Sequence, residues 1–156
     1  MDYFEILLLV HIGGAIIGFG PTFGYAVSGP LTARLEGPAA GGVLQSMVAI
    51  EKRLVTPVAV VTQPLSGVLL TFESGRNNDF FSYEWLWISI LLYVTAFYLA
   101  AFVQTPALEK MIDLGHRGET DSSAFGALAK RTATIGPILI VLLVVIIVLM
   151  VVKPGN

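Results

Sequence analysis

The sequence predicts an all-α integral membrane protein, a bundle of four helices that run alternately up and down through the bilayer. The 156 residues are 55% hydrophobic and only 13% charged, and their mean hydropathy is +0.80. Soluble domains carry about 25% charged residues. Four nearly uncharged stretches are each long enough, at 1.5 Å per residue, to cross the hydrocarbon core. They cover approximately residues 4–29, 53–73, 85–107 and 132–152 of a single transmembrane domain, 1–156.

The first stretch, 4–29, combines small residues with a proline. Gly14 and Gly18, and then Gly20 and Gly24, are spaced four apart, a spacing that lets another backbone approach closely in lipid. Two interpretations follow: packing against the other helices of the chain, which we favour because this helix must dock somewhere, or packing against a second copy. Pro21 removes a backbone hydrogen bond, so we expect a kink near it.

The second and third stretches have more polar character. Pro57 and Pro64 interrupt 53–73, and the missing N–H of Pro64 should free the carbonyl at position 60 for a side-chain donor. Trp85 and Trp87 begin 85–107 and favour the membrane interface. We expect the helices that contain 53–73 and 132–152 to continue past the membrane into the residues that precede them.

The fourth stretch is the most apolar. From Ile138 to Val152, every residue except Met150 is Ile, Leu or Val. Insertion of such a run is favourable by about 4–8 kcal/mol as an upper bound. No polar stripe survives in it, so most of its circumference can contact lipid.

The distribution of basic residues predicts the orientation. Of nine Lys and Arg residues, only Arg76 and Lys153 lie on the side of the two termini, and the other seven lie in or beside the connections 30–52 and 108–131. Because cytoplasmic loops are enriched in Lys and Arg, we expect both termini outside the cell membrane and these two connections in the cytoplasm.

Several functions are excluded or disfavoured by composition. The absence of cysteine rules out disulfides, thiolate metal sites and thioether-linked haem. A net charge of −2 without a basic cluster argues against a nucleic-acid partner. No nucleophile–base pair, carboxylate pair or metal-ligand spacing is found, so we predict no catalytic or metal-binding residues and favour a protein without enzymatic activity, while leaving that question open.

His11 is the only histidine or lysine within the predicted spans. An imidazole in hydrocarbon needs a hydrogen-bond partner. When the helices are matched by depth, four side chains can reach it: Gln63, Ser66, Ser89 and Tyr93. One interpretation is a hydrogen-bonded interior histidine, which we favour. The other is a cofactor ligand, for example to haem iron, although His116 lies at the opposite side and only Met150 offers a second ligand at a suitable depth.

Several motifs together resemble a known group. They are the helix-one histidine followed by small residues, "EKRLVTP", "WLWISILLYV" and "LMVVKP". The chain resembles the bacterial four-helix membrane proteins grouped around copper-resistance protein D and HemJ-type protoporphyrinogen oxidase, and most closely a related uncharacterised family. The resemblance implies that His11 matches a haem b ligand. HemJ-type proteins carry a lysine in helix three, where this chain has Ile88 to Leu91, so their oxidase activity does not carry over.

The sequence therefore predicts a small polytopic membrane protein that lies in the lipid bilayer. We expect an accessory or partner-binding subunit of a membrane complex, with another membrane protein or a second copy as partner. The alternative is a haem b-binding redox protein in which His11 is the axial ligand.

Overall fold

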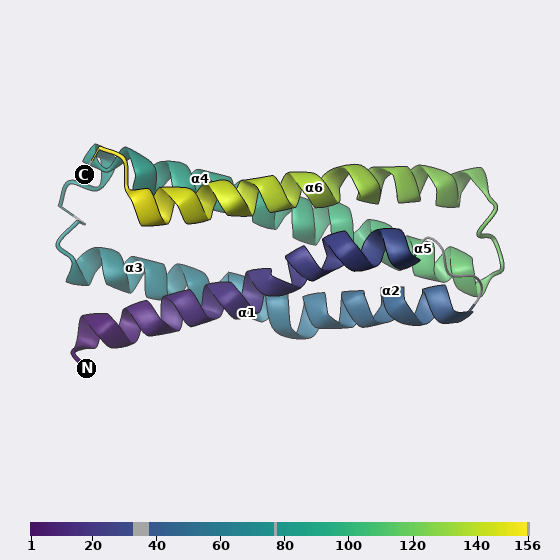
Figure 1. Ribbon diagram of the computed structural model, residues 1–156, viewed down its shortest axis with the longest axis horizontal. Coiled ribbons are helices and arrows are strands. Elements are labelled where there is room, and N and C mark those ends of the chain that lie inside the picture. The colour runs from purple at the N-terminus through teal and green to yellow at the C-terminus, as the bar shows by residue number, and fades with distance from the viewer. Residues whose placement is uncertain (33–37, 77, 156) are drawn as a thin grey trace.

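The computed structural model describes residues 1–32, 38–76 and 78–155, and these form helices without strands. Four long helical segments lie side by side, with both termini at one end of the bundle (Figure 1). We call this the terminal end; it also holds the connection 74–83. The opposite, or loop, end holds the connection 117–122. The up-down-up-down four-helix bundle predicted from the sequence is confirmed.

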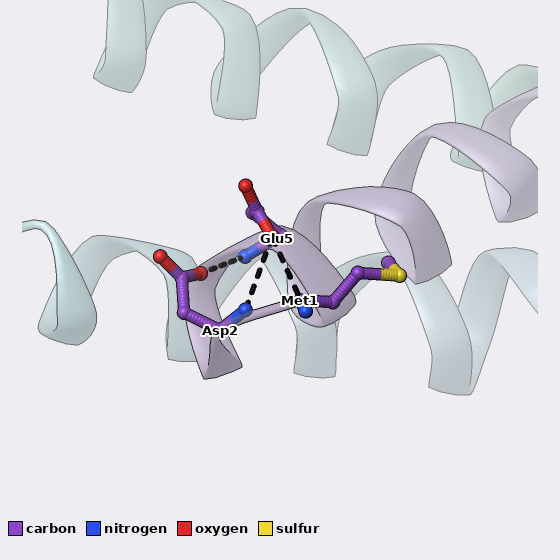
Figure 2. Close-up of polar contacts among 3 residues, drawn as sticks. All are labelled: Met1, Asp2 and Glu5. Carbon is purple, nitrogen blue, oxygen red and sulfur yellow. Dashed lines mark hydrogen bonds and ion pairs between the residues drawn. The ribbon is translucent and has the colours of Figure 1, made fainter.

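The first segment is a single helix, α1 (Tyr3–Thr32), that continues through Pro21. Its start is fixed by a capping box: the Asp2 carboxylate accepts from the Glu5 backbone N–H at 2.8 Å, and the Asp2 N–H donates to the Glu5 carboxylate at 3.0 Å (Figure 2). This reciprocal pair satisfies two N–H groups that the first helical turn leaves without partners. The kink expected near Pro21 stays a prediction.

The second segment is helical from 38 to 73 but changes its hydrogen-bond register twice. It consists of α2 (Pro38–Ile50), the π-helical turns η1 (Glu51–Val55) and η2 (Val58–Thr62), and α3 (Gln63–Glu73). Each π turn ends two residues before a proline, Pro57 or Pro64. Because proline has no N–H to donate, the helix widens by one residue in the turn that precedes it.

The third segment repeats this arrangement. α4 (Glu84–Tyr98) passes through the π turn η4 (Leu99–Gln104) into α5 (Thr105–His116), and Pro106 is the second residue of α5. The Thr105 N–H donates to the Ala100 carbonyl, five residues back. The helix reaches well past residue 107, where the sequence predicted the span to end.

The fourth segment is one uninterrupted helix, α6 (Ser123–Val152). The Ser122 side chain caps it by accepting from the Phe125 N–H at 3.2 Å. Lys153 ends it in a left-handed conformation, with φ of 47°. The helices containing 53–73 and 132–152 thus begin at Pro38 and Ser123, and both extend past the predicted spans toward the loop end.

The bundle has a narrow core and a broad apolar surface. The buried apolar side chains come from all four segments: Leu7, Met47, Val48, Val55, Ala59, Trp85, Leu86, Ala96, Ala107, Met111, Leu139, Leu143 and Ile146. Within the described ranges, four helical stretches are long and apolar enough to cross a membrane: Tyr3–Tyr25, Gly41–Glu73, Glu84–His116 and Ser123–Val152. Their exposed Leu, Ile, Val and Phe side chains suit a lipid solvent.

Candidate functional site around His11

The His11 ring lies on the face of α1 that packs against α3. Its Nδ1 is 2.8 Å from the Ser66 Oγ, and the same hydroxyl donates to the Thr62 carbonyl. A hydroxyl has one proton and a carbonyl can only accept. The Ser66 hydroxyl therefore donates its hydrogen bond to the Thr62 carbonyl, and its oxygen accepts a hydrogen bond from His11 Nδ1–H. In the neutral ring, this leaves Nε2 as the nitrogen that carries the lone pair.

A second polar contact joins the same two helices. The Gln63 side-chain amide donates from Nε2 to the His11 backbone carbonyl at 2.8 Å. Gln63 is 5% exposed and Ser66 is 3% exposed, so both side chains are removed from lipid. Of the four partners predicted for His11, Gln63 therefore contacts its backbone and Ser66 contacts its ring.

The other two predicted partners bond elsewhere. Ser89, which is fully buried, donates to the Trp85 carbonyl of its own helix at 2.6 Å. The Tyr93 hydroxyl donates to the Ala59 carbonyl. These two side chains therefore donate to backbone carbonyls, and Ser66 is the side chain that bonds the His11 ring.

The carbonyl freed by Pro64 lies one residue from the predicted position. Sequence reasoning expected the carbonyl at position 60, as in a regular α-helix. In the π register, the Gln63 N–H bonds to the Val58 carbonyl, so the next carbonyl, that of Ala59, faces a proline five residues on. The carbonyl to which Tyr93 donates is thus the one that the proline leaves free.

Glycines allow α1 to approach the second segment closely. A Cβ on Gly14 would lie 2.7 Å from the Gln63 Nε2, and one on Gly18 would lie 3.0 Å from a Val58 methyl. Both distances are shorter than ordinary van der Waals contact. Larger residues at these two positions would therefore have to displace the Gln63 amide or the Val58 side chain.

A third glycine makes room for the His11 ring from the opposite helix. A Cβ on Gly67 would lie 3.3 Å from the ring carbon Cε1. Gly67 was not among the residues selected from the sequence. The only indication in the sequence is that Gly67 directly follows Ser66, the residue that bonds the ring. That position does not show which face of the helix meets His11.

The four glycines predicted to pack helix one separate into two pairs. Gly14 and Gly18 pack within the chain, whereas a Cβ built at Gly20 or Gly24 meets nothing within 4 Å. For Gly20 the reason is the helical period, which turns position 20 away from the face that holds positions 14 and 18. The structure thus places Gly14 and Gly18 against the second segment, and which surface the four glycines serve stays a prediction.

A small cavity lies farther toward the loop end, at the level of the π turns. Its volume is about 40 Å³, and its polar lining comes from Thr22, Glu51, Thr56 and Tyr93. This is enough for a few water molecules and far below the roughly 300–1,000 Å³ of an ordinary ligand site. His11 does not line it. Sequence reasoning missed Glu51 as an inward-facing residue, although its spacing of four and eight residues from the buried Val55 and Ala59 was a usable signal.

The comparison with protein families identifies a matching family. The model described as "Predicted integral membrane protein (DUF2269)" matches residues 5–154, nearly the whole chain. The chain belongs to this family. It is therefore an integral, multi-pass membrane protein, as the four candidate spans also indicate. Searches of curated proteins and of solved structures found no match. These comparisons give no link to copper-resistance protein D or to HemJ-type proteins, so that resemblance stays a prediction.

The geometry around His11 in this DUF2269 protein can be compared with what a haem ligand would need. Nε2 of His11 is the nitrogen that could ligate iron, and Ser66 orients the ring through Nδ1, as the outer contacts of metal-bound histidines commonly do. However, His11 does not line the small cavity near the π turns, and α1 and α3 are too close to admit a porphyrin between them.

Proposed function

We propose that this DUF2269 protein is an accessory subunit that joins a membrane complex through the outward face of α1. The observation that carries the proposal is the presence of Gly13 and Gly20 on a face with open space. A Cβ built at either one meets nothing within 4 Å. Leu9 and Ile16, on the same face, are 61% and 68% exposed.

The physical argument rests on what drives helix association in lipid. Apolar side chains gain little by leaving lipid for another apolar surface, so helices associate where small residues let their backbones come close. A glycine within a helix costs about 1 kcal/mol relative to alanine. Gly14 and Gly18 offset that cost by admitting the second segment. Gly13 and Gly20 gain nothing comparable within the chain, which supports a partner helix against this face.

Site-specific photo-crosslinking in native membranes tests the proposal. A photoreactive residue at position 16 should give one discrete protein adduct, and Gly20→Leu should abolish it by blocking close approach. Position 148 on α6 is the matched control, since Val148 is 51% exposed and should give lipid adducts only. The adduct mass distinguishes a second copy from another protein. Lipid adducts alone at position 16 would contradict the proposal.

A haem b-binding redox protein is the second candidate, and the hydrogen-bond pattern at His11 supports it. Because the Ser66 oxygen accepts a hydrogen bond from Nδ1–H, the Nε2 lone pair is available to an iron atom. A haem held there would supply one-electron transfer.

The visible spectrum of protein purified from haem-replete cells tests this candidate. The expected result is about one haem per chain, with oxidised and reduced bands that disappear in His11→Ala. His116→Ala removes the other histidine, an exposed residue at the loop end, and should leave the spectrum unchanged. A spectrum without stoichiometric haem, or haem retained in His11→Ala, would rule the candidate out.

A further inference from the structure

Two basic side chains converge on one tryptophan at the terminal end of the bundle. The Arg76 guanidinium carbon lies 5.4 Å from the Tyr83 ring centre and 6.0 Å from that of Trp85, and the Lys153 ammonium lies 5.7 Å from the Trp85 ring centre. We call these four residues the terminal cation cluster. They include both of the basic side chains that the chain places at this end.

Three separate parts of the chain bring the cluster together. Arg76 lies in the turn three residues after the end of α3, and its backbone N–H bonds to the Thr71 carbonyl at 3.1 Å. Trp85 is the second residue of α4. Lys153 occupies the left-handed cap of α6, with its N–H bonded to the Leu149 carbonyl at 2.9 Å. Three helix ends therefore supply the donors, so the cluster depends on the tertiary fold.

Two donors in the cluster are buried without an acceptor. Trp85 is only 5% exposed, and among the described residues neither its indole N–H nor the Nε–H of Arg76 has a hydrogen-bond partner. Leaving such a group unpaired costs about 1–3 kcal/mol, and a buried tryptophan N–H ordinarily finds a partner. Two unpaired donors on residues in contact point to an acceptor from outside the chain.

In the part of the chain that the structure describes, no ion pair joins Arg76 or Lys153 to a carboxylate. Glu73, Asp79 and Glu84 lie at the same end, and all three are exposed. The cluster thus combines two cations that form no direct ion pair among the described residues with two unpaired N–H donors, and this set of groups can bind an anion with several oxygens.

A phosphate group meets these requirements better than a single carboxylate. Stacking on an aromatic face leaves the edge of a guanidinium free for bidentate bonds to phosphate oxygens, while the Lys153 ammonium and the indole N–H can reach further oxygens. The cluster also lies where the membrane spans end and where Tyr and Trp favour the interface. That is the depth of phospholipid headgroups.

We propose that Arg76, Trp85 and Lys153 bind a phosphate group at the terminal end of the bundle. The group would come from a phospholipid headgroup or from free phosphate, and the chemistry of recognition is shared. The site is separate from His11 and from the outward face of α1, so it does not depend on the proposed function.

The indole N–H signals of the protein report on this site directly. The chain has only two tryptophans, Trp85 and Trp87, so a ¹⁵N-labelled sample in a phosphate-free maltoside detergent gives two signals, which Trp85→Phe assigns. The protein is titrated separately with dihexanoyl phosphatidylglycerol and with sodium phosphate, with sodium chloride at matched ionic strength as the salt control. The Trp85 signal should shift and saturate, while the Trp87 signal and the chloride titration should show little change.

The two titrations distinguish the sources. Saturation by the lipid alone identifies a headgroup site, and saturation by both shows that free phosphate is accepted. Arg76→Gln should weaken binding at least tenfold, and Lys153→Gln, at a helix end where folding tolerates change, about threefold to tenfold. Arg53→Gln removes an exposed charge in η1, away from the cluster, and should change binding less than twofold. No saturable shift with either probe, or equal weakening by Arg53→Gln, would overturn the proposal.

Discussion

Ser66 selects the tautomer of the His11 ring. Its hydroxyl donates a hydrogen bond to the Thr62 carbonyl, so its oxygen accepts one from His11 Nδ1–H. Ser66→Ala removes that acceptor and leaves a ring N–H unpaired. Side-chain hydrogen bonds in membrane bundles contribute about 0.6–1.7 kcal/mol, so we expect a loss of this size in the free energy of unfolding, measured in mixed micelles. Ser123→Ala, at an exposed position, should have little effect; an equal loss there would show that the ring bond contributes nothing specific.

Gly13 and Gly14 form a matched pair for testing the contact between α1 and α3. A methyl group at position 14 would come within 2.7 Å of the Gln63 amide, whereas one at position 13 meets nothing within 4 Å. We expect Gly14→Ala to lower the unfolding free energy by about 1–3 kcal/mol through overpacking. Gly13→Ala should leave it unchanged or raise it by up to about 1 kcal/mol. Thermal unfolding of the two variants in one detergent compares them, and the reverse ranking would contradict the packing described above.

At the scale of the element, the π turns show how this bundle accommodates proline. Pro64 cannot donate to the Ala59 carbonyl, and the Tyr93 hydroxyl from α4 donates to it instead. Tyr93→Phe leaves that carbonyl without a side-chain donor, so we expect a loss of about 0.5–1.5 kcal/mol in unfolding free energy.

A double-mutant cycle tests whether proline is the cause. Pro64→Ala restores an N–H that can serve the freed carbonyl, so Tyr93→Phe should cost less in that background than in the natural chain. The matched background is Pro137→Ala on α6, where a proline lies inside a helix without a π turn and no coupling to Tyr93 is expected. Additive losses in the Pro64 background would show that the tyrosine bond is unrelated to the proline.

The sequence alone predicted the helices well and their contacts less well. Long uncharged runs define spans because lipid requires every backbone group to be satisfied within the helix, and this logic holds for all four segments. It did not predict which of four polar side chains would meet the His11 ring, since depth matching places residues along the bundle axis but not around it. Ser66 and Tyr93 both have suitable depths, yet Ser66 contacts the His11 ring, whereas Tyr93 donates to the Ala59 carbonyl and packs against Phe19 of α1.

The π turns and the terminal cation cluster also required the structure. A proline marks where a helix must adjust, but the choice between a kink and a one-residue widening depends on packing against neighbouring helices. Arg76, Trp85 and Lys153 belong to three different helix ends, and no local pattern indicates that the fold brings them together. Sequence periodicity therefore cannot predict a cluster whose members are brought together only by tertiary contacts.

At the scale of the whole molecule, the central claim is a bundle that crosses the membrane four times, with its two ends on opposite sides. Burial is slight for so long a chain, and large apolar side chains remain exposed along every segment, as lipid permits and water does not. The seven basic residues in and beside the connections 30–52 and 108–131 further predict that the loop end lies in the cytoplasm.

Cysteine labelling in intact cells tests this claim most directly, because the natural chain has no cysteine and each introduced thiol reports alone. With a membrane-impermeant maleimide, Asp79→Cys at the terminal end should be labelled from outside. Glu119→Cys at the loop end should be labelled only after the membrane is opened, and Val144→Cys within α6 should be protected in both conditions. Labelling of positions 79 and 119 from the same side, or ready labelling of position 144, would contradict the four-span bundle.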